Sequence, residues 1–207
     1  MMNFLPSDAI ANSILALYFE GKFAGTCIGV APRMVVTAGH HAMLNRDDIG
    51  QFTVMRPSRG RPPVRLAAAE YAAKDRPADL LVLWLDAPVP FVPIRGYLPG
   101  EAAHVATVWL HRDPPHEVIV SPGIVSNSAA QLCEVRGTVS TVGCSGAAVV
   151  NMTGTVIVGM HLSSNTKQGV RVSEFAPARN LLATLSQLGI SLRDVVAEQR
   201  GTKRDRE

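Results

Sequence analysis

The chain contains 207 residues, of which 47% are hydrophobic and 18% are charged, and its formal net charge is +3. This composition excludes general disorder, and the length allows a buried core without metals or crosslinks. Much of the positive charge lies in residues 200–207, which carry no aromatic side chains for base stacking, so we predict a flexible charged tail and no nucleic-acid partner.

The cysteines and the apolar runs set further limits. Cys27, Cys133 and Cys144 are too few and too scattered for a disulfide framework, and no Cys-x-x-Cys pair indicates a metal site. We therefore predict no metal, no cofactor and a reducing compartment, the cytoplasm. The first residues lack the pattern of a secretory signal, and no apolar run approaches the roughly 20 residues that span a bilayer, so we expect no membrane segment.

Residues 1–90 contain short β-prone runs separated by glycine, lysine and proline. Runs of this length and spacing predict the strands of an antiparallel barrel. The predicted strands are 14–19, 25–30, 33–37, 51–55, 64–68 and 80–85. Together they predict a first six-stranded barrel that is complete near Pro90.

Residues 91–100, with Pro93 and Pro99, are the predicted linker to a second half. Beyond it, strands are predicted at 103–110, 116–120, 123–126, 133–139, 147–151, 156–160 and 169–172. They predict a second antiparallel barrel over 101–176, so the expected fold class is all-β, with two antiparallel six-stranded barrels.

The period of the apolar residues changes after the second barrel, and residues 177–199 predict a C-terminal helix. Leu181, Leu182, Leu185 and Leu188 recur at helical spacing and form an apolar stripe. We expect this stripe to pack against the second barrel, because core packing is a commoner use of such a face than contact with a partner protein.

The segment Gly143-Cys144-Ser145-Gly146 lies between two β-prone apolar runs, a setting typical of a turn that presents a nucleophilic serine. A serine hydroxyl is a weak nucleophile at neutral pH, so it needs an imidazole to take its proton and a carboxylate to orient that imidazole. The backbone N–H groups of Gly143 and Ser145 are the predicted oxyanion hole, and Gly146 lets a substrate approach closely.

Two residues of the first half are candidates for the base and the carboxylate. His40 follows the strand 33–37 at its small-residue end, and the adjacent His41 is the alternative base. Asp79 opens a buried apolar run, where a carboxylate needs a partner such as an imidazole N–H. Asp75 competes for this role, and we favour Asp79 because the apolar run starts directly after it.

The chain order His40, Asp79, Ser145 resembles that of the chymotrypsin-like serine proteases. More narrowly, the chain is similar to the main serine proteases of positive-strand RNA viruses, such as those of arteriviruses and sobemoviruses. The narrower resemblance rests on Gly159-Met160-His161, a Gly-x-His pattern soon after the nucleophile.

The resemblance implies a primary specificity pocket. By it, His161 and Ser140 line the pocket with Ser164 on its wall, and the pocket favours Glu or Gln before the scissile bond. Many viral relatives use a cysteine nucleophile, which makes Cys144 an alternative. The family pattern Gly-x-nucleophile-Gly selects Ser145, because only Ser145 lies directly before Gly146 in that register.

These observations predict a serine endopeptidase that acts through an acyl-enzyme. The expected partner is a polypeptide substrate, which includes the protein's own polyprotein precursor if the protein is viral, bound along an edge strand at Ser163, Ser164 and Asn165. One alternative is a cellular trypsin-like protease of other specificity. A second alternative is a protease fold that no longer cuts and serves as a binding module.

Overall fold

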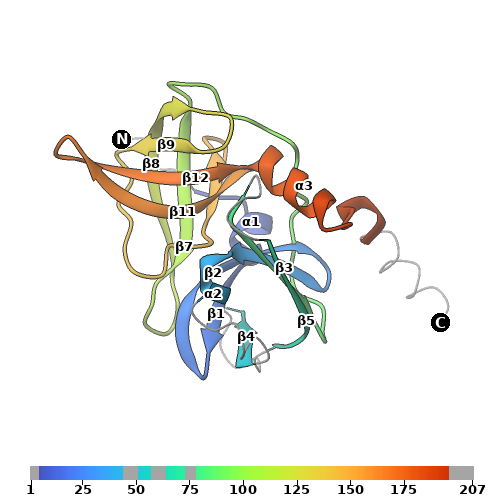
Figure 1. Cartoon of the computed structure of the whole chain (residues 1–207). Coiled ribbons are helices and arrows are strands. Elements are labelled where there is room, and N and C mark those ends of the chain that lie inside the picture. The colour runs from blue at the N-terminus through green and yellow to red at the C-terminus, as the bar shows by residue number, and fades with distance from the viewer. Residues whose placement is uncertain (1–4, 44–50, 57–63, 73–77, 196–207) are drawn as a thin grey trace.

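The computed structural model describes residues 5–43, 51–56, 64–72 and 78–195, and within them the chain forms two closed antiparallel barrels (Figure 1). The first barrel consists of β1 (Ile14–Phe19), β2 (Lys22–Ala31), β3 (Met34–Ala38), β4 (Phe52–Met55), β5 (Val64–Ala72) and β6 (Leu80–Leu85), in the order β1-β2-β3-β6-β5-β4. The second consists of β7 (His104–Leu110), β8 (Val118–Ser128), β9 (Cys133–Arg136), β10 (Ala148–Asn151), β11 (Ile157–Lys167) and β12 (Val170–Pro177), in the order β10-β11-β12-β9-β8-β7. The predicted fold class is therefore confirmed.

The strands of the first barrel bury apolar side chains on both faces. In β1, Leu15 and Leu17 lie inside the first barrel, whereas Ile14 and Ala16 belong to a core shared by the two barrels. Strand β6 alternates in the same way between these two cores. Two-sided burial explains why these strands are continuously apolar, and the shared core fixes the barrels against each other.

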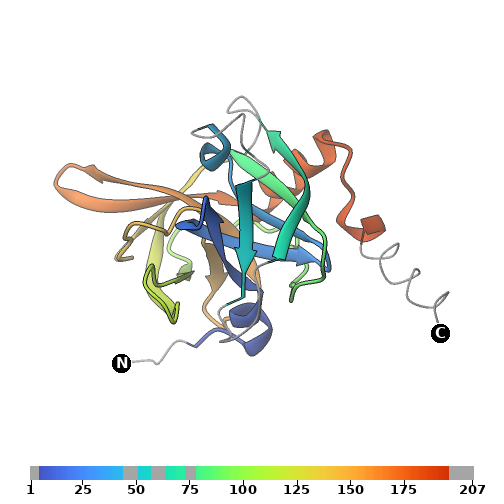
Figure 2. The ribbon, with the colours of Figure 1, turned by 90° about the horizontal axis from the view of Figure 1, so that it is seen from below.

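The hairpin of β11 and β12 is much longer than the sequence predicts, and it projects away from the second barrel in both views (Figures 1 and 2). Its outer part, 161–167, is mostly polar, so it gives no apolar alternation from which a strand is predicted. Gln168 and Gly169 close the hairpin with φ angles of 51° and 77°, as in a type I′ turn.

Strand β8 also differs from the prediction. The two predicted strands 116–120 and 123–126 correspond to one continuous strand, Val118–Ser128. The predicted break at Ser121 and Pro122 is wrong. Gly123 stays in the strand and brings β8 close to β9, where a Cβ on it would lie 2.7 Å from the carbonyl oxygen of Arg136.

Three helices lie wholly within the described part of the chain, and residues 192–195 are also helical. The sequence analysis missed α1 (Asp8–Ser13), which is too short for a periodic apolar pattern, and α2 (His40–Met43), a single turn. The C-terminal helix predicted over 177–199 is present in part: α3 (Ala178–Gln187) ends before Gly189, helical structure resumes at 192–195, and residues 196–199 lie outside the described residues. Leu181 and Leu185 of α3 are buried in the shared core, so the leucine stripe packs within the molecule.

Among the described residues, no helix has both the length and the apolar character needed to cross a membrane.

Candidate active site

Strand pairing in the first barrel brings His40 and Asp79 together. Ala38, the last residue of β3, pairs with Leu80, the first residue of β6, and the next N–H, that of Gly39, donates to the carbonyl oxygen of Asp79 at 3.1 Å. His40 then donates twice to Asp79 Oδ2, from Nδ1 at 2.9 Å and from its backbone N–H at 3.2 Å. A proton held on Nδ1 by the carboxylate leaves Nε2 as a proton acceptor.

The neighbouring His41 occupies a different environment. Its side chain is buried, and its ring packs against Gly25, where a Cβ would lie 2.8 Å from both Cε1 and Nε2 of the ring. Burial and, to a smaller extent, the charge of His40 lower the pKa of His41 to about 4. Because the 2.9 Å contact with Asp79 belongs to His40, the geometry favours His40 as the base. Asp75, the competing carboxylate, lies outside the described residues.

The turn that carries Ser145 is docked on the first barrel. The backbone N–H of Thr26 in β2 donates to the carbonyl oxygen of Ser145 at 3.2 Å. Gly146 has a φ of 82°, and a Cβ on it would lie 2.1 Å from the Thr26 carbonyl oxygen and 2.2 Å from Thr37 Oγ1. Only glycine fits there. Thr37 belongs to β3, so the serine turn touches the strand that leads to His40.

The hydroxyl of Ser145 donates to the carbonyl oxygen of Leu162 at 3.4 Å. Leu162 is an extra residue at a β-bulge, because the register of β11 with β12 shifts between His161 and Ser163. Within the described residues, Ser145 Oγ makes no hydrogen bond to His40. The structure thus places Ser145 at the junction of the barrels without closing the hydrogen-bonded series His40, Asp79 and Ser145.

The turn before Ser145 has the features of an oxyanion hole. The N–H of Cys144 donates to the carbonyl oxygen of Thr141 at 3.2 Å, and Gly143 has a φ of 98°, a region that favours glycine. Thr26 Oγ1 donates to the carbonyl oxygen of Gly143 at 2.9 Å and so fixes the turn. In the part of the chain that the structure describes, the N–H groups of Gly143 and Ser145 donate to no protein acceptor. Both are therefore available to a substrate oxygen.

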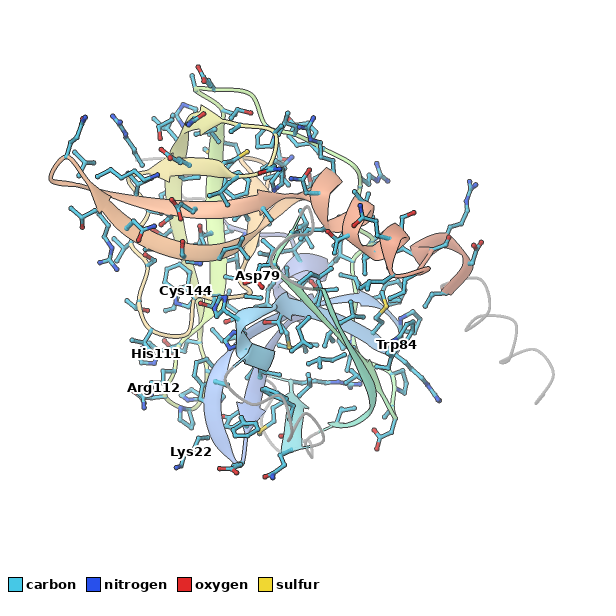
Figure 3. The ribbon with its side chains drawn as sticks, viewed as in Figure 1. Lys22, Asp79, Trp84, His111, Arg112 and Cys144 are labelled. Atoms are coloured by element: carbon cyan, nitrogen blue, oxygen red, sulfur yellow. The ribbon has the colours of Figure 1, made fainter. Side chains whose placement is uncertain are left out.

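The thiol of Cys144 is unsuited to the role of nucleophile. Its side chain is 1% exposed and packs against Trp109 and Ala147. Sγ accepts a hydrogen bond from the backbone N–H of Thr141 at 3.1 Å, and burial raises the pKa of the thiol. Figure 3 shows Cys144 and Asp79 at the junction of the two barrels. The buried side chain of Cys144 therefore packs beneath the turn, whereas Ser145 is partly exposed.

His161 and a group of hydroxyls form a second polar cluster, inside the second barrel. His161 is 3% exposed, and its Nε2 lies 3.3 Å from Ser164 Oγ. Ser164 Oγ also contacts the hydroxyl of Ser140 and lies 3.4 Å from that of Ser173, which accepts from Thr138 Oγ1 at 2.7 Å. The structure therefore brings together all three residues that the resemblance assigned to a specificity pocket.

The electrostatic state of His161 follows from its burial. Burial lowers its pKa to about 4, with smaller lowering contributions from the charges of His40 and Arg171. The imidazole is therefore neutral at neutral pH. A neutral ring can donate one hydrogen bond to a ligand oxygen while neighbouring hydroxyls set its orientation.

The outer part of β11 offers a free edge for main-chain pairing. Strand β10 pairs with β11 only as far as Met160, so no described strand covers the edge at Ser163 and Asn165. The side chains of these two residues point away from the cluster of His161 and hydroxyls, because both donate to Glu174 Oε2, at 2.6 Å and 2.9 Å. Ser163 is thus placed to act through its backbone rather than its hydroxyl.

Sequence reasoning missed residues that support both clusters. Thr184 of α3 accepts a hydrogen bond from the N–H of Ala78 at 3.0 Å, directly before Asp79. Thr138 and Ser173 extend the hydroxyl cluster. A strand prediction that continued past Val172 would have placed Ser173 on the pocket face, whereas no sequence pattern links Thr184 to Ala78.

A cavity of about 500 Å³ lies beside the turn that precedes Ser145, between Thr141, Val142, Trp109 and Ile119. Its lining includes none of His40, Asp79 and Ser145. In the described residues, no group of three or more His, Cys, Asp or Glu side chains is arranged to hold a metal ion.

Comparison with solved structures identifies the architecture. Kallikrein-related peptidase 10 in complex with Zn²⁺ matches with a TM-score of 0.69 at 12% identity, over 89% of this chain and 98% of that one. The inactive form of the Rv3671c protease of M. tuberculosis matches with a TM-score of 0.66 at 14% identity, over 91% of this chain and 100% of that one. Neuropsin, a serine protease of mouse brain, matches with a TM-score of 0.67 at 11% identity, over 87% and 95%.

The chain has the chymotrypsin-like fold. No protein-family model and no curated protein matches its sequence. At identities of 11–14%, the structural likeness shows the fold alone.

Proposed function

We propose that the protein is a serine endopeptidase in which Ser145 is the nucleophile, His40 the general base and acid, and Asp79 the orienting carboxylate. The observation that carries the proposal is the 2.9 Å contact between His40 Nδ1 and Asp79 Oδ2 at the junction where Ser145 is docked. The free N–H groups of Gly143 and Ser145 support it. So do the names of the structural neighbours, which include a peptidase and a serine protease.

The proposed reaction follows from these positions. His40 Nε2 takes the proton of Ser145 Oγ as Oγ attacks the scissile carbonyl carbon, and the N–H groups of Gly143 and Ser145 stabilise the oxyanion. His40 then gives the proton to the leaving amine, and the C–N bond breaks. Water attacks the acyl-enzyme through the same base, which releases the acid and restores Ser145.

The first step requires Ser145 Oγ to leave the Leu162 carbonyl and turn toward His40. The present bond is long, at 3.4 Å, and therefore weak. Hydrogen bonds of catalytic groups commonly tighten only when substrate is bound. Substrate pairing along the free edge at Ser163 would occupy the space beside Leu162 and favour the turned hydroxyl.

For specificity, we propose that His161, Ser140 and Ser164 bind Glu or Gln before the scissile bond, and that the protein processes a viral polyprotein in the host cytoplasm. The buried neutral imidazole and its hydroxyl neighbours support recognition of a side-chain oxygen. The viral context rests on the Gly-x-His pattern at Gly159-Met160-His161.

Two measurements on the folded protein test the proposal. A serine-directed phosphonate should label Ser145 in the wild type and leave Ser145→Ala unlabelled, with both proteins equally folded by circular dichroism. Cleavage of a peptide library should then show Glu or Gln before the cut bond. Absence of labelling would favour the non-cutting binding module, and a preference for Arg or small apolar residues would favour a trypsin-like enzyme of other specificity.

A further inference from the structure

Arg171 lies on the face of β12 that is turned toward the hydroxyl cluster. Ser173 pairs with Ser164, and Arg171 pairs with Thr166, in the antiparallel register of β12 with β11. Side chains two residues apart on a strand share one face. Arg171 therefore stands on the same face as Ser173 and Ser164, one step farther out along the hairpin.

A hydrogen bond ties the guanidinium of Arg171 to the pocket wall. Its Nη2 donates to the carbonyl oxygen of Ser140, whose hydroxyl contacts Ser164 Oγ. Ser164 Oγ in turn lies 3.3 Å from His161 Nε2. The positive charge of Arg171 thus lies next to Ser140, one of the groups that would receive a substrate side chain. This charge contributes to lowering the pKa of His161.

The rest of the pocket provides hydrogen bonds without charge. Ser140, Ser164 and Ser173 are neutral hydroxyls, and His161 is neutral at neutral pH because burial lowers its pKa to about 4. These neutral groups would bind a carboxylate and a carboxamide with similar affinity, since both substrate groups offer an oxygen to the imidazole N–H. Selection between Glu and Gln needs a charged group nearby.

The acidic side chains of the hairpin lie on the face opposite Arg171, although the charge of Glu174 acts on the pKa of His161 in the opposite sense to that of Arg171. Glu174 on β12 pairs with Glu134 on β9, on the face opposite Arg171. Both carboxylates contact Lys167, whose Nζ lies 3.0 Å from Glu174 Oε1. Glu174 also accepts from Ser163. Among the described residues, Arg171 makes no ion pair with a carboxylate, so its charge is not neutralised by a direct partner.

We propose that Arg171 is a specificity-determining residue that makes the pocket prefer Glu over Gln before the scissile bond. The inference rests on the proposed endopeptidase function and on the pocket assigned to His161. Arg171 is exposed, so solvent weakens its field, and we expect a preference of roughly tenfold rather than thousands.

The test uses two peptides that differ only in Glu or Gln before the cut bond, with kcat/KM measured for each. The wild type should cleave the Glu peptide about tenfold faster, and this preference should weaken as salt is raised. Arg171→Gln should bring the ratio near one by slowing the Glu peptide alone. Arg171→Lys should keep part of the preference, because it keeps the charge.

The matched control is Arg136→Gln. Arg136 is exposed on β9 and pairs with Val172, so it lies on the same sheet as Arg171 but on the opposite face. The same change of charge there should leave the Glu to Gln ratio within about twofold of the wild type. Equal shifts from Arg136→Gln and Arg171→Gln would overturn the inference, because general charge would then explain both.

Further outcomes separate this inference from the proposed function. Equal slowing of both peptides in Arg171→Gln would show that Arg171 only holds the Ser140 carbonyl, and a wild-type preference for Gln would also overturn the inference. In either case the endopeptidase proposal stands. A protein whose Ser145 labels but which cuts after other residues refutes the pocket assignment and this inference together, whereas failure of Ser145 to label refutes the endopeptidase itself.

Discussion

His40 and His161 carry the same imidazole in two different surroundings. The His40 side chain is 35% exposed at the junction of the barrels, and its Nδ1 donates to a carboxylate. His161 is 3% exposed inside the second barrel and has hydroxyl neighbours. In the proposed mechanism the first setting suits the base, because Asp79 holds a proton on Nδ1 and leaves Nε2 to accept the proton of Ser145. The second keeps a ring neutral, which suits recognition. For the proposed enzyme, the surroundings of the two rings, rather than the residue type, would thus separate proton transfer from selection of the substrate.

The largest expected effect on kcat/KM comes from removing the imidazole of His40 beside the carboxylate of Asp79. His40→Ala should lower kcat/KM by about 10⁴-fold or more for every peptide, because the base is lost whatever the substrate side chain. His41→Phe keeps a ring against Gly25 and should lose no more than about tenfold. Steady-state kinetics on both variants decides between the adjacent histidines, and an active His40→Ala beside an inactive His41→Phe would reverse the assignment.

Replacing the imidazole of His161 in the proposed specificity pocket should instead weaken recognition of the substrate. His161→Gln should lower kcat/KM by about 10²-fold for a peptide with Glu before the scissile bond, since a buried hydrogen bond to the substrate is lost. Labelling of Ser145 by a small uncharged phosphonate should continue at a rate within about threefold of the wild type. Loss of labelling in a folded His161→Gln protein would contradict a role confined to recognition.

The buried histidines also predict how stability depends on pH. His41 and His161 have a pKa of about 4 in the folded chain, lowered by burial, whereas an unfolded histidine titrates near 6.5. The unfolded state therefore binds more protons between these values, so the free energy of unfolding should be highest above pH 6.5 and fall as pH drops toward 4. Each ring contributes up to roughly 3 kcal/mol.

Urea unfolding between pH 4.5 and 7 measures this dependence. Glu174 acts in the same direction only at the acidic end of this range, because its pKa is lowered in the folded chain and its contribution is lost as pH falls toward that lowered pKa. The variant His161→Gln should reduce the slope by about half, since His41 remains. A slope unchanged by the substitution would show that His161 does not stay neutral in the folded protein.

The smallest expected effect concerns the support beneath Asp79. Thr184→Val removes the acceptor of the Ala78 N–H and leaves a buried donor unpaired, which should cost about 1–2 kcal/mol of unfolding free energy. We expect kcat to fall a few-fold because Asp79 is the next residue. Thr184→Ser keeps the hydroxyl and should match the wild type in both urea unfolding and kcat. Equal losses in the two variants would indicate lost packing of the methyl group instead.

The sequence was informative where chemistry and local pattern coincide. Apolar runs bounded by glycine and proline predicted the two barrels, and the start of the run at Leu80 pointed to Asp79. It was uninformative where contacts join distant segments. The bond from Ala78 to Thr184 spans 106 residues, and that from Arg171 to Ser140 spans 31, so no spacing rule reveals either. The outer hairpin was underestimated because its residues are mostly polar and give no apolar alternation from which a strand is predicted.

The fit of Gly146 against Thr26 and Thr37 leaves no room for a single methyl group. Neither half of the chain can therefore assemble the proposed chemistry alone, and even slight separation of the halves would dismantle it. During synthesis, a partly folded chain would be inert toward its neighbours. For the proposed enzyme, the ability to cut would therefore require both barrels to be folded and in contact.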